Sequence, residues 1–233
     1  MKLSIKYLFS LCLALASLSA SATLIPSYDK FGALPQATFG GTGISNSNVA
    51  ISTLNPTVSV FGHEIGLGTV TLGLTATGRY NDPALTNDGH GTFFSAAGAD
   101  QHDASSVFQK LALWNIDFYI GGDALALAQY SYRLLVDVDP TSGESFKTID
   151  IGLFTGAQNS MNMGFDLDEL LYNYHFNPLT AGQYSFQLQA VNSKGIVADS
   201  TSIVVRAVPE PASLALFGIA LIGLFAVARR RQA

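Results

Sequence analysis

Cysteine is almost absent from this chain of 233 residues, because Cys12 is its single thiol. Cys12 lies inside an apolar run near the N-terminus, and we expect that run to be cut off during export. The mature chain then has neither a thiol nor a disulfide. This excludes a disulfide-stapled scaffold and a cysteine nucleophile, so the fold must depend on its hydrophobic core.

The motifs of several enzyme classes are missing as well. A zinc-hydrolase helix needs two histidines four positions apart with a glutamate after the first, and His63-Glu64 begins this pattern, but the second histidine is replaced by Leu67. No Gly-x-Ser-x-Gly nucleophile elbow occurs. The glycine-rich segment 39–48 lacks the Lys-Ser/Thr pair of a phosphate-binding loop and predicts a surface loop. We therefore expect no enzymatic activity.

Positive charge is scarce between the two ends of the chain. Residues 23–207 contain seven Lys and Arg against sixteen Asp and Glu, a net charge of −9 with neutral histidines. This balance argues against nucleic acid or anionic lipid as a partner of a basic patch. Divalent cations and neutral sugars remain compatible with it.

The N-terminal residues have the three parts of a secretory signal peptide. Lys2 and Lys6 form a basic head, residues 8–18 form an apolar core, and Ala20 and Ala22 provide the small-x-small pattern of a cleavage site. We expect signal peptidase to cut after Ala22, which makes Thr23 the first mature residue. A lipoprotein signal would need a cysteine at the cut, and the sequence has none there.

The C-terminal end has an equally clear order of parts. Pro209-Glu210-Pro211 is followed by an apolar segment, residues 212–228, and then by Arg229, Arg230 and Arg231. As a helix the apolar segment reaches roughly 27 Å, close to the thickness of a bilayer core. The arginines favour the cytoplasmic side, so the preceding domain is expected outside the cytoplasm.

This order of parts resembles the PEP-CTERM sorting signal of Gram-negative bacteria. The resemblance covers residues 208–233 and implies that the tail first spans the inner membrane. It also implies processing by an exosortase, a membrane protease-transpeptidase, and transfer to the cell surface or to an extracellular matrix of exopolysaccharide, as in a biofilm. A single-pass anchor that is never cut is the alternative reading of the tail.

The region 23–207 is predicted to be one all-β domain. Apolar residues recur with period two in residues 67–77, 112–120, 130–138, 149–153, 183–190 and 201–206, which predicts strands with one buried and one solvent-facing side. Residues 139–143 and 192–195 are typical of hairpin turns.

The last third of this region suggests a particular architecture. The segment Leu179 to Tyr184 resembles the tyrosine corner of Greek-key sandwiches, in which the tyrosine hydroxyl bonds back to the chain. Together with Trp114 on an earlier strand, it predicts an immunoglobulin-like or Greek-key β-sandwich. Residues 166–174 are expected to form a short helix, with a strand over 170–176 as the alternative.

Three groups of residues are candidate ligand sites. Asp137, Asp139 and Glu144 offer oxygen ligands around a turn, which suits calcium, and a plain acidic turn is the alternative. The carboxylates within 166–169 form a weaker cluster of the same kind. Tyr119, Tyr172 and Tyr174 are candidates for stacking on sugar rings if they are exposed and coplanar, and core packing is the alternative.

Three functions are compatible with these observations. The first is a non-catalytic exported structural or interaction protein. The second is a carbohydrate-binding module for exopolysaccharide. The third is a hydrolase, which requires His90 or His102 to lie within hydrogen-bond reach of a carboxylate inside a pocket.

Overall fold

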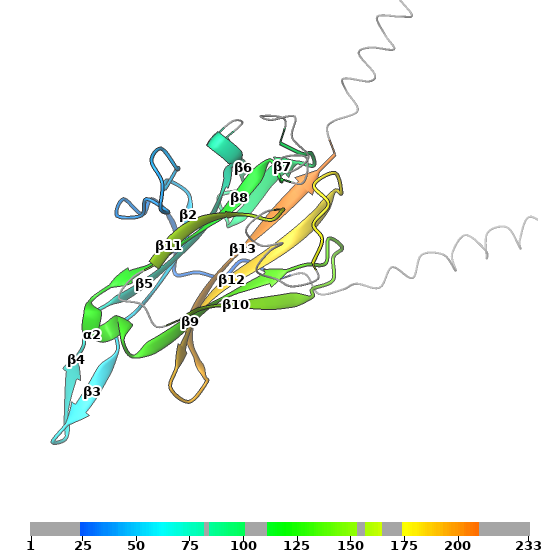
Figure 1. Cartoon of the computed structure of the whole chain (residues 1–233). Coiled ribbons are helices and arrows are strands. Elements are labelled where there is room, and N and C mark those ends of the chain that lie inside the picture. Colours follow the sequence, from blue (N-terminus) through cyan, green and yellow to red (C-terminus); the bar gives the residue numbers. More distant parts are fainter. Residues whose placement is uncertain (1–23, 82–83, 101–110, 153–156, 165–173, 210–233) are drawn as a thin grey trace, which may run out of the picture.

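The computed structural model describes residues 24–81, 84–100, 111–152, 157–164 and 174–209, and these are mostly β-strands. Figure 1 shows the strands gathered into one elongated body. In chain order, the elements are β1 (Lys30–Gly32), β2 (Val49–Leu54), β3 (Thr57–Val60), β4 (His63–Gly66), β5 (Val70–Gly78), η1 (Arg79–Asn81), β6 (Thr86–Asn87), β7 (Thr92–Ala96), β8 (Trp114–Gly122), α2 (Ala124–Leu127), β9 (Tyr130–Asp137), β10 (Phe146–Gly152), β11 (Ala157–Asn162), β12 (Gly182–Asn192) and β13 (Val197–Val208).

Two large sheets make up the body. One has the strand order β1-β2-β5-β8-β11, and all its pairs are antiparallel. The other has the order β10-β9-β12-β13-β7-β6. In that second sheet β7 runs parallel to β13, a pairing that the sequence analysis did not predict. A parallel pair needs a long connection, and here the connection from β7 to β13 runs through most of the domain.

The hydrophobic core lies between the two sheets. Alternate residues of β5 and β8, among them Leu72 and Ile116, share one cluster with Leu134 of β9 and Phe186 of β12. Trp114 lies at its aromatic centre, with ring centroids 5.9 Å from Phe186 and 5.8 Å from Tyr184. Burial of these side chains is the main favourable term for a domain that has no disulfide.

Tyr184 was expected to form a tyrosine corner. Its ring is buried between Trp114 and Phe176, with centroids 5.8 Å and 5.7 Å away. Within the described residues, no hydrogen bond from its hydroxyl to the chain upstream is present. The ring therefore contributes to the core through packing.

The strands predicted from period two are found, and so are both hairpins. Residues 139–143 connect β9 to β10, and residues 192–195 connect β12 to β13. One expectation was wrong: β5 has no solvent-facing side, because Thr75 and Thr77 are buried like Leu72 and Leu74. The segment 33–48 covers that outer face of the sheet, as described below.

Several elements were not predicted. Strands β1 and β2, on either side of the glycine-rich segment 39–48, and strands β6 and β7 had no period-two pattern in the sequence. The short helix α2 and strand β11 were also missed. The predicted helix at 166–174 lies almost wholly outside the described residues.

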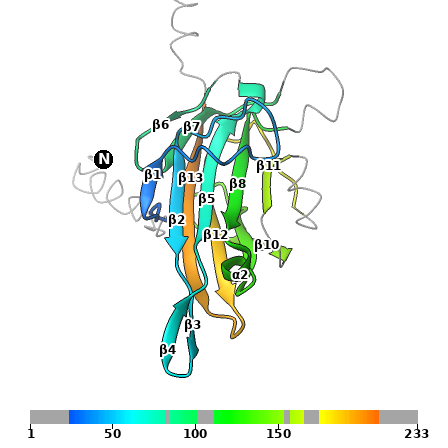
Figure 2. The same cartoon turned by 90° about the vertical axis from the view of Figure 1, so that its left-hand side faces the viewer.

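A two-stranded ribbon, β3 and β4, projects from one end of the body, as Figures 1 and 2 show from two sides. Its turn residues Phe61 and Gly62 both have positive φ, 50° and 82°, the geometry of a tight hairpin turn. The ribbon places His63 in a strand rather than on a helix, so the partial zinc-hydrolase pattern has no helical context.

Leu72 provides a test of the two-sheet core. Leu72→Ala should lower the free energy of unfolding by about 2–5 kcal/mol, because it removes a fully buried side chain from the centre of β5. Urea unfolding followed by the fluorescence of Trp114, the single tryptophan, measures this change. The matched control is Leu179→Ala at a leucine that is 72 % exposed, which should change the value by less than about 0.5 kcal/mol. Equal effects of the two substitutions would contradict the assigned core.

Candidate functional site

Segment 33–48 forms a fixed cover on the outer face of the five-stranded sheet. The side-chain oxygen of Gln158 on β11 accepts hydrogen bonds from the backbone amides of Thr38 and Phe39, at 2.9 and 2.8 Å. Thr75 of β5 donates its hydroxyl to the carbonyl of Asn48 at 2.7 Å. The cover is therefore bonded to the sheet near its middle and at its C-terminal end.

Apolar packing holds the middle of the cover. Leu34 and Phe39 are buried in a second, smaller cluster with Val49 and Ile51 of β2. Leu34 lies directly over Gly73 of β5, where an added Cβ would come within 2.6 Å of the leucine methyl group. A side chain at position 73 would force the Leu34 side chain to move, so the glycine allows this close approach.

A groove opens beside residues 42–44 of the cover. Its walls are Thr42, Ile44, Thr77, Tyr80, Asn115 and Ser160, with Gly43 and Gly78 between them, and its volume is about 380 Å³. We call it the Thr77 groove. Strands β5, β8 and β11 form its floor, and the 42–44 turn forms one wall.

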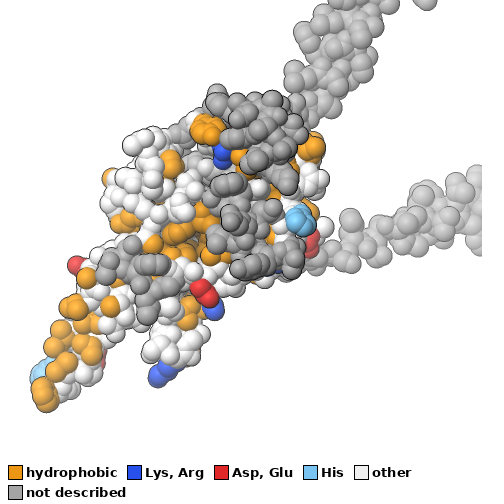
Figure 3. Space-filling view, viewed as in Figure 1, with side chains coloured by type: hydrophobic (Ala, Val, Ile, Leu, Met, Phe, Trp, Pro, Cys, Tyr) orange, Lys and Arg blue, Asp and Glu red, His pale blue; other side chains and the backbone are white. Residues whose placement is uncertain are grey.

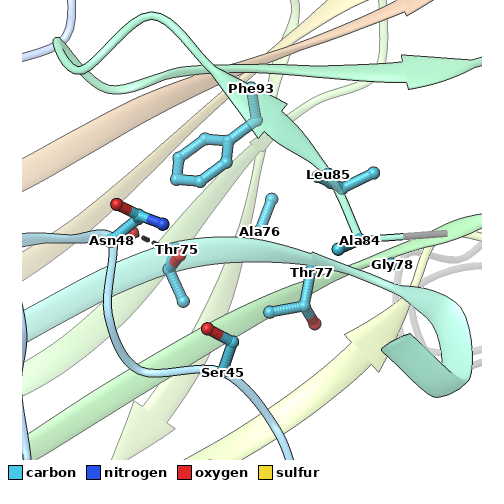
Figure 4. Close-up of a pocket in the computed structure, with 9 residues that line it drawn as sticks. All are labelled: Ser45, Asn48, Thr75, Ala76, Thr77, Gly78, Ala84, Leu85 and Phe93. Atoms are coloured by element: carbon cyan, nitrogen blue, oxygen red, sulfur yellow. Dashed lines mark hydrogen bonds between the residues drawn. The ribbon is translucent and has the colours of Figure 1, made fainter. Parts of the chain in front are cut away.

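A smaller cavity of about 100 Å³ shares Thr77 and Gly78 with the Thr77 groove. Strand β5 runs between the two sides of this smaller cavity. Figure 4 shows that Thr75 and Thr77 point toward Ser45, whereas Ala76 points toward Phe93. The polar lining thus comes from the outer face of β5 and the apolar lining from the inner face.

Asp117 of β8 lies beneath the Thr77 groove. It is fully buried, and its Oδ2 accepts a hydrogen bond from Thr77 Oγ1 at 2.7 Å. Ser160 of β11 is its direct cross-strand neighbour. Within the described part of the chain, Oδ1 of Asp117 has no hydrogen-bond partner.

The described elements packed around this buried carboxyl group provide no countercharge. The elements packed around Asp117 are β5, β11 and the cover 33–48, and none of them contains Lys, Arg, His, Asp or Glu. Burial therefore raises the pKa of Asp117 from 3.8 to about 6, against the opposing effect of the Ser160 and Thr77 hydroxyl groups. The sequence pattern had placed Asp117 on a solvent-facing side of its strand, which is wrong, because the cover buries that side.

A chain of side-chain hydrogen bonds fixes the rest of the floor. Asn162 donates its amide to Asn115 Oδ1 at 2.9 Å, and Asn115 in turn donates to Ser160 Oγ at 3.1 Å. Asn162 is itself buried and bonded to the backbone of Ala112 at 3.0 Å. The groups that face the groove therefore have defined orientations.

Tyr80 forms the exposed wall of the groove. It is 60 % exposed and has φ of 56°, a conformation that is uncommon for a residue with a bulky side chain. The Arg79 guanidinium lies 4.7 Å from the centroid of its ring and also pairs with Asp100 at 2.6 Å. Such strain is found at functional sites more often than elsewhere.

The calcium candidates do not form a ligand set. Asp137 is buried, and its Oδ1 accepts the backbone amides of Asp139 and Ser145, at 3.1 and 2.8 Å, as a carboxylate does in a plain turn. Glu144 is exposed. Among the residues that the structure describes, no three His, Cys, Asp or Glu side chains are grouped to hold a metal ion. The cluster at 166–169 lies outside the described residues.

The tyrosine candidates are not brought together. Tyr119 packs against the cluster beneath the cover, whereas Tyr174 packs against the core between the sheets and against Phe176, with ring centroids 6.5 Å apart. Tyr172 lies outside the described residues. The exposed aromatic residue beside a groove is Tyr80, which the sequence analysis did not select, because no periodic pattern marks a residue in a turn.

Of the two histidine candidates, only His90 lies in the described part of the chain, and it lines neither of the cavities described above. His90 is exposed in the turn between β6 and β7, where its backbone amide bonds to Asp88 at 2.7 Å. His102 lies outside the described residues. The geometry that the hydrolase hypothesis needs is therefore not seen at His90.

The β3–β4 ribbon has one apolar face. Val58, Val60 and Ile65 share that face and are 41 %, 38 % and 49 % exposed, and Phe61 at the tip is 100 % exposed. On the other face Thr57 donates to Glu64 at 2.7 Å. Figure 3 shows hydrophobic side chains along the ribbon up to its tip. An exposed apolar patch of this kind is typical of an interaction surface.

Asp117 makes the stability of the domain depend on pH. Because the pKa of this carboxyl group is higher in the folded than in the unfolded chain, the folded state holds its proton more tightly. The free energy of unfolding therefore falls as the pH rises from about 4 to about 6, by roughly 3 kcal/mol in total. Asp117→Asn should therefore match the wild type at pH 4 and be more stable at pH 7.5, by roughly 2–3 kcal/mol. Urea unfolding at both pH values measures this. Asp150→Asn, at an exposed position on β10, is the control, and equal pH dependence of the wild type and Asp117→Asn would refute the assignment.

The residues of the candidate sorting signal begin directly after β13, the last strand of the six-stranded sheet in chain order. The carbonyl of Val208, the last residue of β13, accepts a hydrogen bond from Ala97 at 2.7 Å, and Pro209 is exposed directly after it. Glu210, Pro211 and Arg229 to Arg231 lie outside the described residues, as do Ala20, Ala22 and Thr23 at the other end. Within the described ranges, no helix combines the length and apolarity that a bilayer crossing requires.

Comparison with known proteins identifies this tail. A protein-family model, described as PEP-CTERM protein-sorting motif, matches residues 207–231. No curated protein and no solved structure matches the chain significantly. The match begins in the last two residues of β13, so the motif follows the folded domain without a spacer. The chain therefore carries a PEP-CTERM sorting motif as its C-terminal tail, which implies an exported protein that an exosortase processes and sorts to the cell surface.

Proposed function

We propose that this protein is a non-catalytic structural or interaction protein of the cell surface or extracellular matrix, associated there with exopolysaccharide. The observation that carries the proposal is the sorting motif at residues 207–231, placed directly behind an all-β domain. Signal peptidase removes residues 1–22, the tail holds the chain in the inner membrane, and exosortase then releases or transfers the domain. We also infer that the domain is a Greek-key, immunoglobulin-like sandwich, which the two packed sheets support.

The junction limits where the tail can be cut. Ala207 is buried and Val208 is paired to β7, so a cut before residue 208 would remove part of an interior strand. From Val208 to the first residue of the apolar segment, Ala212, the chain spans at most about 14 Å. We infer that exosortase cuts within residues 208–211 and that the end of the folded domain lies close to the membrane surface at that moment.

The β3–β4 ribbon supports a role in interaction. It lies at the end of the body opposite to the point where the chain leaves β13, as both views show. While the tail is anchored, the ribbon is therefore at the end of the domain that is farthest from the point of anchorage. We infer that it contacts other molecules of the surface layer.

Intact mass tests the sorting step. The full chain is expressed in a host with its own exosortase, and the secreted and surface fractions should contain a product that begins at Thr23 and ends within residues 208–211. Glu210→Ala and removal of residues 229–231 should reduce this product. An uncut, membrane-bound product that ends at Ala233 would make the tail a simple anchor and would refute the proposal.

A ribbon variant tests the interaction role. Replacement of Val58, Val60 and Ile65 by Thr, together with Phe61→Asn, should move processed protein from the surface fraction to the medium. The thermal unfolding midpoint should stay close to the wild-type value, because these side chains are exposed. Immunoblots of both fractions measure the distribution. Ile25→Thr, at an apolar residue that is 84 % exposed outside the ribbon, is the control and should leave the distribution unchanged. An unchanged distribution in the ribbon variant would show that the ribbon plays no part in retention.

A further inference from the structure

We propose that the Thr77 groove binds a neutral sugar unit of a glycan. Its volume of about 380 Å³ lies within the range of small-ligand sites, and it is open to solvent beside Tyr80, so a unit within a longer glycan chain can enter. The inference goes beyond the proposed function, because it assigns a ligand class to a site that does not depend on tail processing.

The chemistry of the walls selects the ligand class. The groove is lined by the hydroxyl groups of Thr42, Thr77 and Ser160, the amide of Asn115 and the phenol ring of Tyr80. None of the described residues that line it is charged, so these walls offer no cation to bind a phosphate or a carboxylate. An apolar ligand would leave these polar groups without partners, which is costly. A neutral polyol satisfies them.

The hydrogen bonds on the floor define what the ligand must supply. Thr77 uses its hydroxyl hydrogen on Asp117, so its oxygen can serve the groove only as an acceptor. Ser160 accepts from Asn115 and lies opposite Asp117, whose charged form its hydroxyl favours. Both hydroxyl oxygens are therefore placed to accept hydrogen bonds from a ligand, and sugar hydroxyl groups can donate them.

Asp117 adds discrimination by charge. Its buried carboxyl group lies under the groove with one oxygen that has no partner in the described residues and with no countercharge on the packed elements. When it is ionised, it repels acidic ligands through a medium that screens poorly. Uronic acids and sulfated sugars should therefore bind more weakly than neutral sugars.

Tyr80 provides an aromatic surface at the rim. Sugar rings present apolar C–H faces that pack on aromatic rings, and the ring of Tyr80 is 60 % exposed beside the hydroxyl-lined floor. The Arg79 guanidinium, which is itself paired with Asp100, lies against this ring and restricts its position. The strained backbone of Tyr80 is explained if the turn serves to place this ring.

Calorimetric titration tests the site. The full chain, kept in a zwitterionic detergent that contains no sugar, is titrated with neutral gluco-, manno- and galacto-oligosaccharides and with oligogalacturonate as the acidic probe. At least one neutral series should bind, and oligogalacturonate should bind at least about tenfold more weakly. Tyr80→Asn and Ser160→Ala should each lower the association constant about tenfold, a change expected from the loss of one aromatic or polar contact. Asparagine is chosen because it tolerates positive φ.

Phe61→Asn is the matched control. Phe61 is also an exposed aromatic residue with positive φ, but it lies on the β3–β4 ribbon rather than beside the groove. This variant should bind like the wild type, and thermal unfolding should show that all three variants are folded. Absence of binding by every neutral series would overturn the proposal. It would also be overturned by equal binding of the acidic probe, or by wild-type affinity in both groove variants.

Discussion

The packing of segment 33–48 onto the outer face of the five-stranded sheet is the contact on which the described site depends. Leu34 can approach because position 73 is glycine, and Gln158 holds the segment through two backbone amides. This contact buries most of the second side of β5 and part of the second side of β8, including Asp117. It also withdraws Asp117 from water and forms the wall of the groove. A loop without regular structure thus determines the electrostatics of the sheet beneath it.

The sequence predicted the strands well and their surroundings poorly. Period two in β5, β8 and β9 reflects the pleat, and the turns after β9 and β12 have the residues that such turns require. The same pattern does not say what covers the second face, because threonines such as Thr75 and Thr77 are compatible with either environment. Short strands such as β6 and β7 gave no pattern, since two to five residues are too few to show a period.

The candidate site could not be found from the sequence for a related reason. Asp117 alternates with apolar residues as any exposed aspartate in a strand would, and only the cover makes it unusual. Tyr119 has the expected spacing but lies beneath the cover, whereas Tyr80 lies in a turn. The tail is the opposite case, because its signal consists of linear order and hydrophobicity. The order of residues and their hydrophobicity are visible in the sequence without any knowledge of the fold, and residues 207–231 match the sorting motif.

The position of β13 has a consequence for the order of events during export. β13 is the last strand of the domain and yet lies inside its sheet, between β12 and β7, while it also packs across the core onto β2 and β5. A chain that is threaded through the membrane from its N-terminus exposes this strand last. The six-stranded sheet therefore cannot close until residue 208 has crossed, when the next residues to arrive are those of the sorting motif. The strand that completes the fold and the sorting motif are thus translocated one directly after the other.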